Sequence, residues 1–273
     1  MNNIEFIDNE IHIKNVANFD LAQTLDCGQA FRWSQNENGV WRGIAFGKYI
    51  ELCQKDGDII ITGSDQTDFE NIWANYFDLK RDYAIIIKDV SVNETVRKAA
   101  EYSSGIRLLN QDSWEALCSF IISQNNNIPR IKGIVERLCE NFGDKINGGY
   151  TFPSAETVAK FTIDDLAVIR SGFRAKYIID AAQKVVSGEI NLNELKHTDY
   201  DTAREKLMTI KGVGPKVADC VLLYGLSRIE AFPRDVWIKR ALEQMFDGEL
   251  PECAVQYAGI VQQYIFHYIR NNQ

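Results

Sequence analysis

The hydrophobic pattern of the chain changes its period once, and this change limits the folds that are open to it. Up to about residue 63 the apolar residues alternate, as in Ile4–Phe6 and Ile11–Ile13, and Val40–Leu52 is rich in aromatic and branched residues. Such segments favour strands, and Asn38-Gly39 and Asp56-Gly57 are hairpin turn sequences between them. From about residue 92 onward the 3.6-residue period of helices dominates. The chain therefore predicts an α+β fold, with an antiparallel sheet domain followed by an all-helical domain.

Length and composition fit this organisation. The chain has 273 residues, of which 45% are hydrophobic and 25% charged, which is typical of one large globular domain or two ordinary ones. We expect the sheet domain to span residues 1–100 and the helical domain residues 101–273. The first ten residues are acidic and broken by charges, unlike a signal peptide, and no apolar run is long enough to cross a bilayer. We therefore expect a cytoplasmic protein.

Helices are predicted where the helical period is flanked by capping residues. Asp65–Leu79 places four apolar residues on one stripe, namely Phe69, Ile72, Trp73 and Phe77. Asp112-x-x-Glu115 is typical of a capping box that opens a helix through Ser123. Further helices are expected from Asn127 to Gly143, from Pro153-Ser154, and at Arg174–Val186, Tyr200–Met208, Pro215–Leu226, Asp235–Phe246 and Glu252–Ile269.

Charge and cysteine usage limit the partners that the chain can have. Its net charge of -8, taken alone, argues against a nucleic-acid partner, but Arg204–Arg240 carries eight Lys and Arg residues against four acidic ones. The six cysteines, at positions 27, 53, 118, 139, 220 and 253, form no C-x-x-C pair and no tight cluster. We therefore expect reduced, buried thiols, no disulfide framework, no zinc or iron–sulfur site and no cofactor.

The most informative segment is Leu207–Arg240. A helix that ends near Met208 is followed by the loop Ile210–Gly214, and Pro215 opens the next helix. The two glycines allow a tight hairpin, and the free N–H groups at the start of the second helix suit a phosphate. The loop lacks the third glycine of a dinucleotide-binding fingerprint and the spacing of a P-loop. An ordinary turn between two helices explains the loop equally well.

Lys216 favours a chemical role for this hairpin. It occupies the second position of the predicted helix, where the positive end of the helix dipole disfavours a cation. An amine that is destabilised as an ammonium is suited to act as a nucleophile. The structural alternative is a solvated lysine that pairs with Asp219.

Two further residues have a chemical and a structural interpretation. Cys220 lies four residues after Lys216 on the same helical face, so its thiol could lose a proton beside the ammonium, and a core cysteine is the alternative. Asp235 precedes a helical run and is therefore a candidate N-cap. One of its carboxylate oxygens can cap while the other faces a site.

These features together resemble the helix-hairpin-helix-GPD superfamily of DNA glycosylases, and most closely its 8-oxoguanine DNA glycosylase family. The segments that carry the resemblance span nearly the whole chain: CGQAFRW at 27–33, SFIISQNNNIPRI at 119–131, GFRAKY at 172–177, KGVGPKVADC at 211–220, FPRDV at 232–236 and YAGIVQQYIF at 257–266. The resemblance implies a TBP-like sheet domain, a glycosylase and AP lyase activity, and a duplex DNA partner in the bacterial or archaeal nucleoid. We expect a monomer.

The resemblance implies a role for each matching residue. Lys216 would attack C1′ of the damaged nucleotide and form a Schiff base, and Asp235 would stabilise the positive charge on the sugar. The Gly28 carbonyl would accept the N7–H that 8-oxoguanine has and guanine lacks. Cys220 and Phe266 would sandwich the flipped base, and Gln262 would bond its Watson–Crick edge.

The implied DNA contacts come from three other segments. Asn125 would fill the space that the flipped nucleotide leaves, and Phe173 would wedge between base pairs. Arg130 and Arg174 would bond the estranged cytosine. Gly212 and Gly214 would hold the DNA backbone, and the carbonyls of Met208, Ile210 and Val213 are a possible cation site in the hairpin. Outside the resemblance, Asn125 is equally compatible with a polar loop, Arg130 and Arg174 would usually be solvated, and core packing would be the default for Phe266.

The sequence departs from the better-known animal pattern at three positions. Phe173 replaces a tyrosine, Trp237 a histidine that contacts phosphate, and Tyr224 a methionine of the pocket. The last change should reshape the pocket. Two other hypotheses stay open, namely a glycosylase for other damaged bases and a non-catalytic helix-hairpin-helix module that binds DNA.

Overall fold

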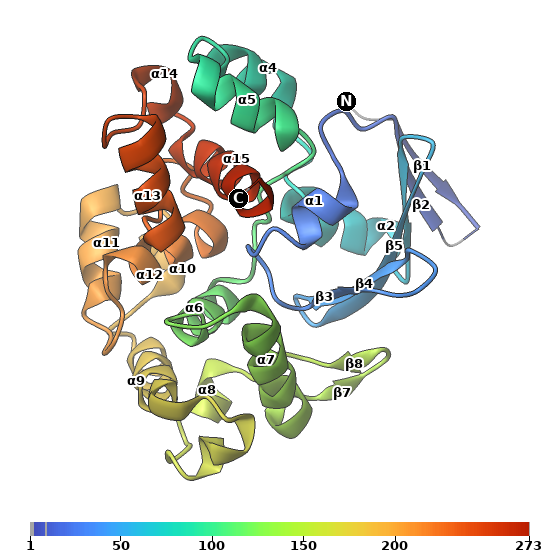
Figure 1. The fold of residues 1–273 in the computed structure, drawn as a ribbon. Coiled ribbons are helices and arrows are strands. Elements are labelled where there is room, and N and C mark those ends of the chain that lie inside the picture. Colours follow the sequence, from blue (N-terminus) through green and yellow to red (C-terminus); the bar gives the residue numbers. More distant parts are fainter. Residues whose placement is uncertain (1–2, 9, 273) are drawn as a thin grey trace.

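The N-terminal part of the chain forms the predicted antiparallel sheet. The computed structural model describes residues 3–8 and 10–272. Its six-stranded sheet has the order β1-β2-β6-β5-β4-β3, with every neighbouring pair antiparallel, and lies to one side of the helices (Figure 1). The strands are β1 (Asn3–Ile7), β2 (Glu10–Lys14), β3 (Trp33–Gln35), β4 (Trp41–Ala45), β5 (Lys48–Lys55) and β6 (Asp58–Thr62).

Tight turns join the strands where glycine permits a positive φ. Gly39 and Gly57, at φ +80° and +86°, form the two predicted turns between β3 and β4 and between β5 and β6. The strand-rich run Val40–Leu52 is divided by a turn that was not predicted, at Phe46-Gly47, where φ is +52° and +72°.

Aromatic side chains fill the core between the sheet and the helical segment that follows it. That segment, predicted at Asp65–Leu79, comprises α2 (Gln66–Asp68), the π-helical turn η1 (Phe69–Trp73) and α3 (Ala74–Tyr76). Trp33 and Tyr76 are buried here, and the indole Nε1 of Trp33 donates to the hydroxyl of Tyr76 at 2.8 Å. Burial of each large side chain contributes about 1.5–3 kcal/mol.

Two short helices in the N-terminal third were missed by the sequence analysis. They are α1 (Leu21–Leu25) and α4 (Tyr83–Val90). Each has an aspartate at its N-cap, because Asp20 accepts from the Gln23 N–H and Asp82 from those of Ala84 and Ile85.

The remaining chain is mostly helical. It contains α5 (Glu94–Tyr102), α6 (Ser113–Ile122), α7 (Ile128–Phe142), α8 (Ala155–Val158), η2 (Asp165–Ile169), η3 (Gly172–Arg174), α9 (Ala175–Val186), α10 (Leu192–Leu195), α11 (Tyr200–Met208), α12 (Pro215–Cys220), η4 (Val221–Gly225), α13 (Val236–Met245), α14 (Glu252–Val255) and α15 (Ala258–Asn271). A two-stranded hairpin, β7 (Lys145–Ile146) and β8 (Gly149–Tyr150), was not predicted. No helix within the described residues is long and apolar enough to cross a membrane.

Most predicted helix starts are confirmed by their caps. Asn127 caps α7, Ser154 caps α8 and Asp112 caps α6. The capping box at α6 is only half formed, because the Glu115 carboxylate pairs with Arg32 of the sheet domain at 3.4 Å. The predicted helix Glu252–Ile269 is in fact two helices, α14 and α15.

The two domains meet along a segment that belongs to both. The larger core is built from the helices after residue 82, yet it also contains Cys27 and Phe31, which lie between α1 and β3. The loop that carries Gly28 is thereby held against the helical domain. The predicted boundary at residue 100 stays a prediction.

Candidate active site

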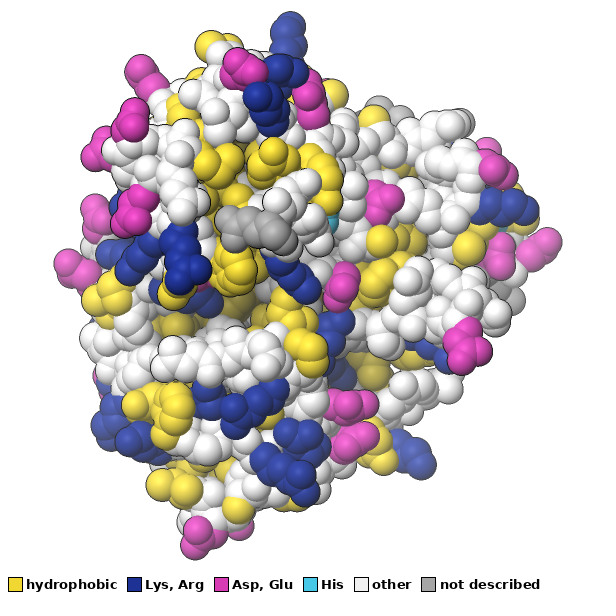
Figure 2. Space-filling model, viewed as in Figure 1, with side chains coloured by type: hydrophobic (Ala, Val, Ile, Leu, Met, Phe, Trp, Pro, Cys, Tyr) yellow, Lys and Arg dark blue, Asp and Glu magenta, His cyan; other side chains and the backbone are white. Residues whose placement is uncertain are grey.

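One cavity lies on the face where the loop after α1 meets helices from the C-terminal domain. Its volume is about 740 Å³. Figure 2 shows a hollow in this face with Lys and Arg side chains on either side of it. Six of the predicted site residues line the cavity: Gly28, Asn125, Gly214, Lys216, Asp235 and Phe266. Segments that are up to about 240 positions apart in the sequence therefore contribute to one site.

Lys216 is the second residue of α12, as predicted, and its amine is half-buried at the cavity wall. The Nζ atom lies 3.4 Å from the Ser123 hydroxyl and 5.5 Å from the centre of the Phe120 ring. These two residues of α6 and its C-terminus hold the side chain toward the cavity.

The alternative pairing of Lys216 with Asp219 is wrong. Asp219 is buried and instead accepts hydrogen bonds from the Tyr200 hydroxyl at 2.8 Å and from the Arg204 Nε at 2.6 Å. These bonds tie α11 to α12 and thus fix the two helices that flank the hairpin.

Asp235 caps a helix and also lines the cavity, as its two interpretations from the sequence allow. Its Oδ1 accepts the backbone N–H of Ile238 at 2.8 Å, which makes Asp235 the N-cap of α13. The same residue lines the cavity that contains Lys216. The cap fixes the orientation of the carboxylate, so that its second oxygen is available to the site.

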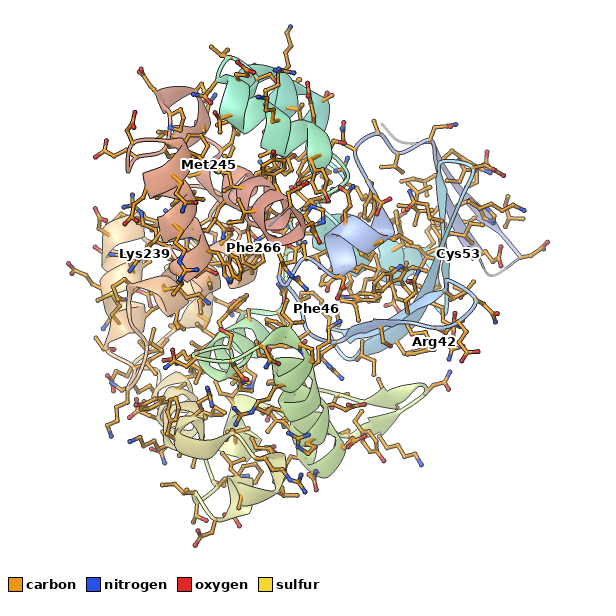
Figure 3. The ribbon with its side chains drawn as sticks, in the orientation of Figure 1. Arg42, Phe46, Cys53, Lys239, Met245 and Phe266 are labelled. Atoms are coloured by element: carbon orange, nitrogen blue, oxygen red, sulfur yellow. The ribbon has the colours of Figure 1, made fainter. Side chains whose placement is uncertain are left out.

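Gly28 occupies a position that disfavours any other residue. Its φ is +87°, and a Cβ atom added there would lie 3.1 Å from Cδ1 of Ile128 and 3.7 Å from Cε1 of Phe266. Backbone at this wall of the cavity is therefore close to the ring of Phe266, which Figure 3 shows on α15.

The other two residues predicted to hold the base lie behind the cavity wall. Cys220 and Gln262 are 3% and 4% exposed and do not line the cavity. Tyr224 is buried beside them: its ring stacks on Phe120 with centroids 5.1 Å apart, and its hydroxyl donates to Gln262 at 3.4 Å. Contact of Cys220 and Gln262 with a base stays a prediction.

Of the two interpretations of Cys220, the structure favours the core cysteine, because the residue is buried. Burial raises the pKa of its thiol to about 11, although the charge of Lys216 acts in the opposite direction. The thiol form therefore prevails at neutral pH, and Cys220 contributes a packing surface rather than a dipole of opposite charges.

The predicted wedge and its neighbour have different surroundings. Phe173 is 49% exposed, whereas Arg174 is buried. The Arg174 guanidinium donates to the backbone carbonyls of Gln124, at 2.9 Å from Nε, and Asn125, at 3.0 Å from Nη2. Arg174 thus holds the loop that presents Asn125, and its bond to cytosine stays a prediction. Arg130 is exposed on α7.

The hairpin between α11 and α12 has the expected shape. Gly212 has a φ of +78°, and Val213 donates its N–H to the Ile210 carbonyl at 3.0 Å. The possible cation site at the carbonyls of Met208, Ile210 and Val213 stays a prediction. Within the described residues, no group of three or more His, Cys, Asp or Glu side chains is placed to hold a metal.

Sequence reasoning missed the residues that surround the lysine. Phe120 and Ser123 fall within the segment that resembles the family, and their spacing of three places them on one face of α6. This periodicity indicates that Phe120 and Ser123 lie next to each other, but it does not indicate that they contact Lys216. Arg234, Lys239 and Arg270 also line the cavity and make its rim basic, and Lys239 is visible on α13 in Figure 3.

Comparisons with known proteins agree with this arrangement. Residues 11–117 match the 8-oxoguanine DNA glycosylase N-terminal domain family, and residues 118–249 match the HhH-GPD superfamily of base excision DNA repair proteins. The N-glycosylase/DNA lyase of Saccharomyces cerevisiae is 33% identical over 83% of this chain and 68% of its own length.

Two solved structures are similar along their whole length. MBOgg1, solved with a low-affinity DNA ligand, is 41% identical with a TM-score of 0.94, and the match covers 99% of each chain. The 8-oxoguanine glycosylase/lyase of Clostridium acetobutylicum, solved with dsDNA containing cytosine opposite 8-oxoG, is 37% identical with a TM-score of 0.93 over 99% of this chain and 98% of its own. The chain therefore belongs to the 8-oxoguanine DNA glycosylase family of N-glycosylase/DNA lyases, within the helix-hairpin-helix-GPD superfamily of base excision repair.

Proposed function

We propose that this chain excises 8-oxoguanine opposite cytosine from duplex DNA, as a monomeric bifunctional glycosylase and AP lyase. The observation that carries the proposal is the convergence of Lys216, Asp235, Gly28 and Phe266 on one cavity. Its volume of about 740 Å³ is within the range of pockets that enclose a small ligand, which suits a nucleotide flipped out of the duplex.

In the proposed reaction Lys216 first gives up one proton to solvent, and its neutral amine attacks C1′ of the flipped nucleotide. The C1′–N9 bond breaks, and the base leaves with the bonding electrons and takes a proton from the attacking nitrogen. The lone pair of the Lys216 nitrogen then expels O4′, which takes a proton from solvent as the C1′–O4′ bond breaks, and a protonated Schiff base between Lys216 and C1′ results. Loss of a C2′ proton expels the 3′ phosphate by β-elimination, and water releases the enzyme.

Asp235 acts electrostatically in this scheme. While Oδ1 remains bonded to the Ile238 N–H, the second carboxylate oxygen stabilises the positive charge that develops on the sugar. A carboxylate that is already fixed by a cap needs little reorganisation in the transition state, which favours the reaction.

Recognition combines the remaining predicted residues. The Gly28 carbonyl accepts N7–H of the lesion, Phe266 and Cys220 cover its faces, and Gln262 bonds its Watson–Crick edge. Guanine would place a lone pair against the Gly28 carbonyl and lose this hydrogen bond. The Clostridium relative that was solved with 8-oxoG opposite cytosine supports the choice of lesion and partner base.

The DNA side of the proposal uses residues outside the base pocket. Asn125 occupies the vacated space, Phe173 separates the neighbouring pair, and Arg130 and Arg174 contact cytosine. The exposure of Phe173 and the bond from Arg174 to the Asn125 carbonyl support this arrangement, because the wedge and the filling residue are tied together.

Borohydride trapping on a duplex with one 8-oxoguanine opposite cytosine tests the proposal. We expect a covalent adduct with the wild type and a decrease of about 1,000-fold or more with Lys216→Gln. Lys239→Gln is a matched control, because it removes a different lysine that lines the cavity and should leave trapping largely intact. Full trapping by Lys216→Gln would refute the nucleophile, and no base release from any lesion duplex would favour a DNA-binding module without activity.

A further inference from the structure

One face of helix α9 contacts both Phe173, the exposed residue predicted to act as a wedge, and the hairpin between α11 and α12. The ring of Phe173, just before the helix, packs edge-on against Tyr177, with centroids 5.9 Å apart at 72°. The Tyr177 ring in turn lies against Gly212: a Cβ atom added to that glycine would be 2.4 Å from Cδ2 of the tyrosine. Glycine at this position therefore lets the hairpin backbone rest on the aromatic ring.

One turn further along the same face, Asp180 holds the hairpin by hydrogen bonds. Its Oδ2 accepts the backbone N–H of Lys211 at 2.9 Å, and its Oδ1 lies 3.2 Å from the Lys211 Nζ. The side chain of Asp180 is 10% exposed, whereas that of Lys211 is 74% exposed. The buried carboxylate of Asp180 thus anchors the backbone of the hairpin, while most of the Lys211 side chain is exposed to solvent.

Burial of a carboxylate costs free energy unless hydrogen bonds or ion pairs compensate it. We therefore expect Asp180 to have a role at this position. The side chains of Ile210 and Val213 bury the two sides of the hairpin in the core, and the Val213 N–H bonds within the loop, whereas the bond from the Lys211 N–H to Asp180 ties the exposed tip to α9. A backbone loop that must fit against DNA phosphates gains affinity when its conformation is set before binding.

We propose that Asp180 and Tyr177 are positioning residues that set the hairpin for contact with the DNA backbone. The inference rests on the proposed function in that it takes the hairpin to be a DNA contact. Asp180 touches neither the flipped base nor the reacting atoms, so its removal should weaken DNA binding and leave the chemical step unchanged.

The test measures affinity and chemistry separately. The dissociation constant is measured on an undamaged duplex and on one with a tetrahydrofuran abasic analogue, and the excision rate is measured in single turnover at saturating enzyme. We expect Asp180→Ala to raise both dissociation constants about 10-fold, as for loss of a hydrogen bond to a charged group, with the excision rate within about 2-fold of wild type. Asp180→Asn keeps an acceptor and should lose less affinity, and it serves if the alanine variant does not fold.

A double-mutant cycle identifies which part of Lys211 matters. Lys211→Ala removes the ammonium but keeps the backbone N–H. If Asp180 acts through that N–H, Asp180→Ala costs the same fold in affinity in the Lys211→Ala background as in the wild type. If it acts only through the ion pair, the second substitution has no effect, and the proposed anchoring of the backbone is wrong.

Glu189→Gln is the matched control, because it breaks the pair between Glu189 and Lys184 at the far end of α9, away from the hairpin. It should leave affinity unchanged. An Asp180→Ala variant that binds like the wild type overturns the inference while wild-type excision still supports the proposed function. A wild type that neither binds nor excises overturns the proposed function instead.

Discussion

Lys216 and Phe120 face each other at the cavity wall, with the amine nitrogen 5.5 Å from the centre of the ring. Phe120 does not move independently, since its ring stacks on that of Tyr224, 17° from coplanar, and packs edge-on against Phe31. The lysine thus rests on an aromatic stack that is itself fixed in the core. This contact gives the proposed nucleophile a defined position before any DNA is bound.

Replacing Phe120 by leucine should separate this positioning from DNA binding. The variant keeps an apolar wall but removes the ring face, an interaction worth about 0.5–2 kcal/mol. We expect the single-turnover excision rate to fall about 3–10-fold while the affinity for undamaged duplex stays the same. An unchanged rate, in a variant whose thermal unfolding is close to wild type, would show that the stack is only core packing.

Asp235→Asn should remove the electrostatic role and keep the cap. Asparagine is as good an N-cap as aspartate, so the free energy of unfolding should change by less than about 0.5 kcal/mol. Excision should slow by about 100–1,000-fold, because a charge aimed at the transition state is lost. Chemical denaturation and single-turnover assays on the same preparation check both values, and parallel loss of stability and activity would point to capping alone.

Gly28→Ala should damage the lesion pocket more than the fold. A non-glycine residue at φ +87° costs about 1–2 kcal/mol, and the added methyl group also approaches Ile128 and Phe266. We expect excision of 8-oxoguanine to fall at least 10-fold. Gly188→Ala is the control, because Gly188 has a similar φ of +78° with nothing within 4 Å of the added Cβ. Equal effects of the two substitutions on excision would show that Gly28 is not part of the lesion pocket.

Glu115 should make the stability of the protein depend on pH. Burial raises the pKa of its carboxyl from 4.5 to about 7, although Arg32 acts in the opposite direction. Between pH 4.5 and about 7 the folded chain therefore binds more protons than the unfolded chain, so the free energy of unfolding falls as pH rises through this window.

The measurement is the difference in unfolding free energy between wild type and Glu115→Gln at several pH values. We expect this difference to shift in favour of the variant by about 1–3 kcal/mol from pH 5 to pH 8, since glutamine does not titrate. A difference that is constant with pH would mean that Glu115 is ionised throughout.

Local chemistry explains why many elements could be predicted from the sequence. The caps at Asn127, Ser154 and Asp235 act within three residues, so their signals are complete in the sequence itself. The missed helix α4 contains three consecutive isoleucines, of which Ile85 is exposed, and such a run has no clear helical stripe.

The candidate site was predictable to a different degree. The hairpin and Lys216 are local features, and the resemblance supplied their partners. The contact between Lys216 and Ser123 joins residues 93 positions apart and arises only from tertiary packing. The burial of Cys220 has the same origin, which is why the sequence left its two interpretations open.

The packing of Cys27 and Phe31 into the helical core has a consequence for any attempt to dissect the protein. A fragment that begins after the sheet domain would lack Cys27 and Phe31, which belong to the core of the helical domain. It would also lack Gly28, which lines the cavity. Such a fragment would retain Lys216 but lack Gly28 and Phe31, which line the same cavity, so the complete cavity cannot be obtained by simple truncation. One wall of the cavity therefore comes from the N-terminal part of the chain and is held in place by the helical part.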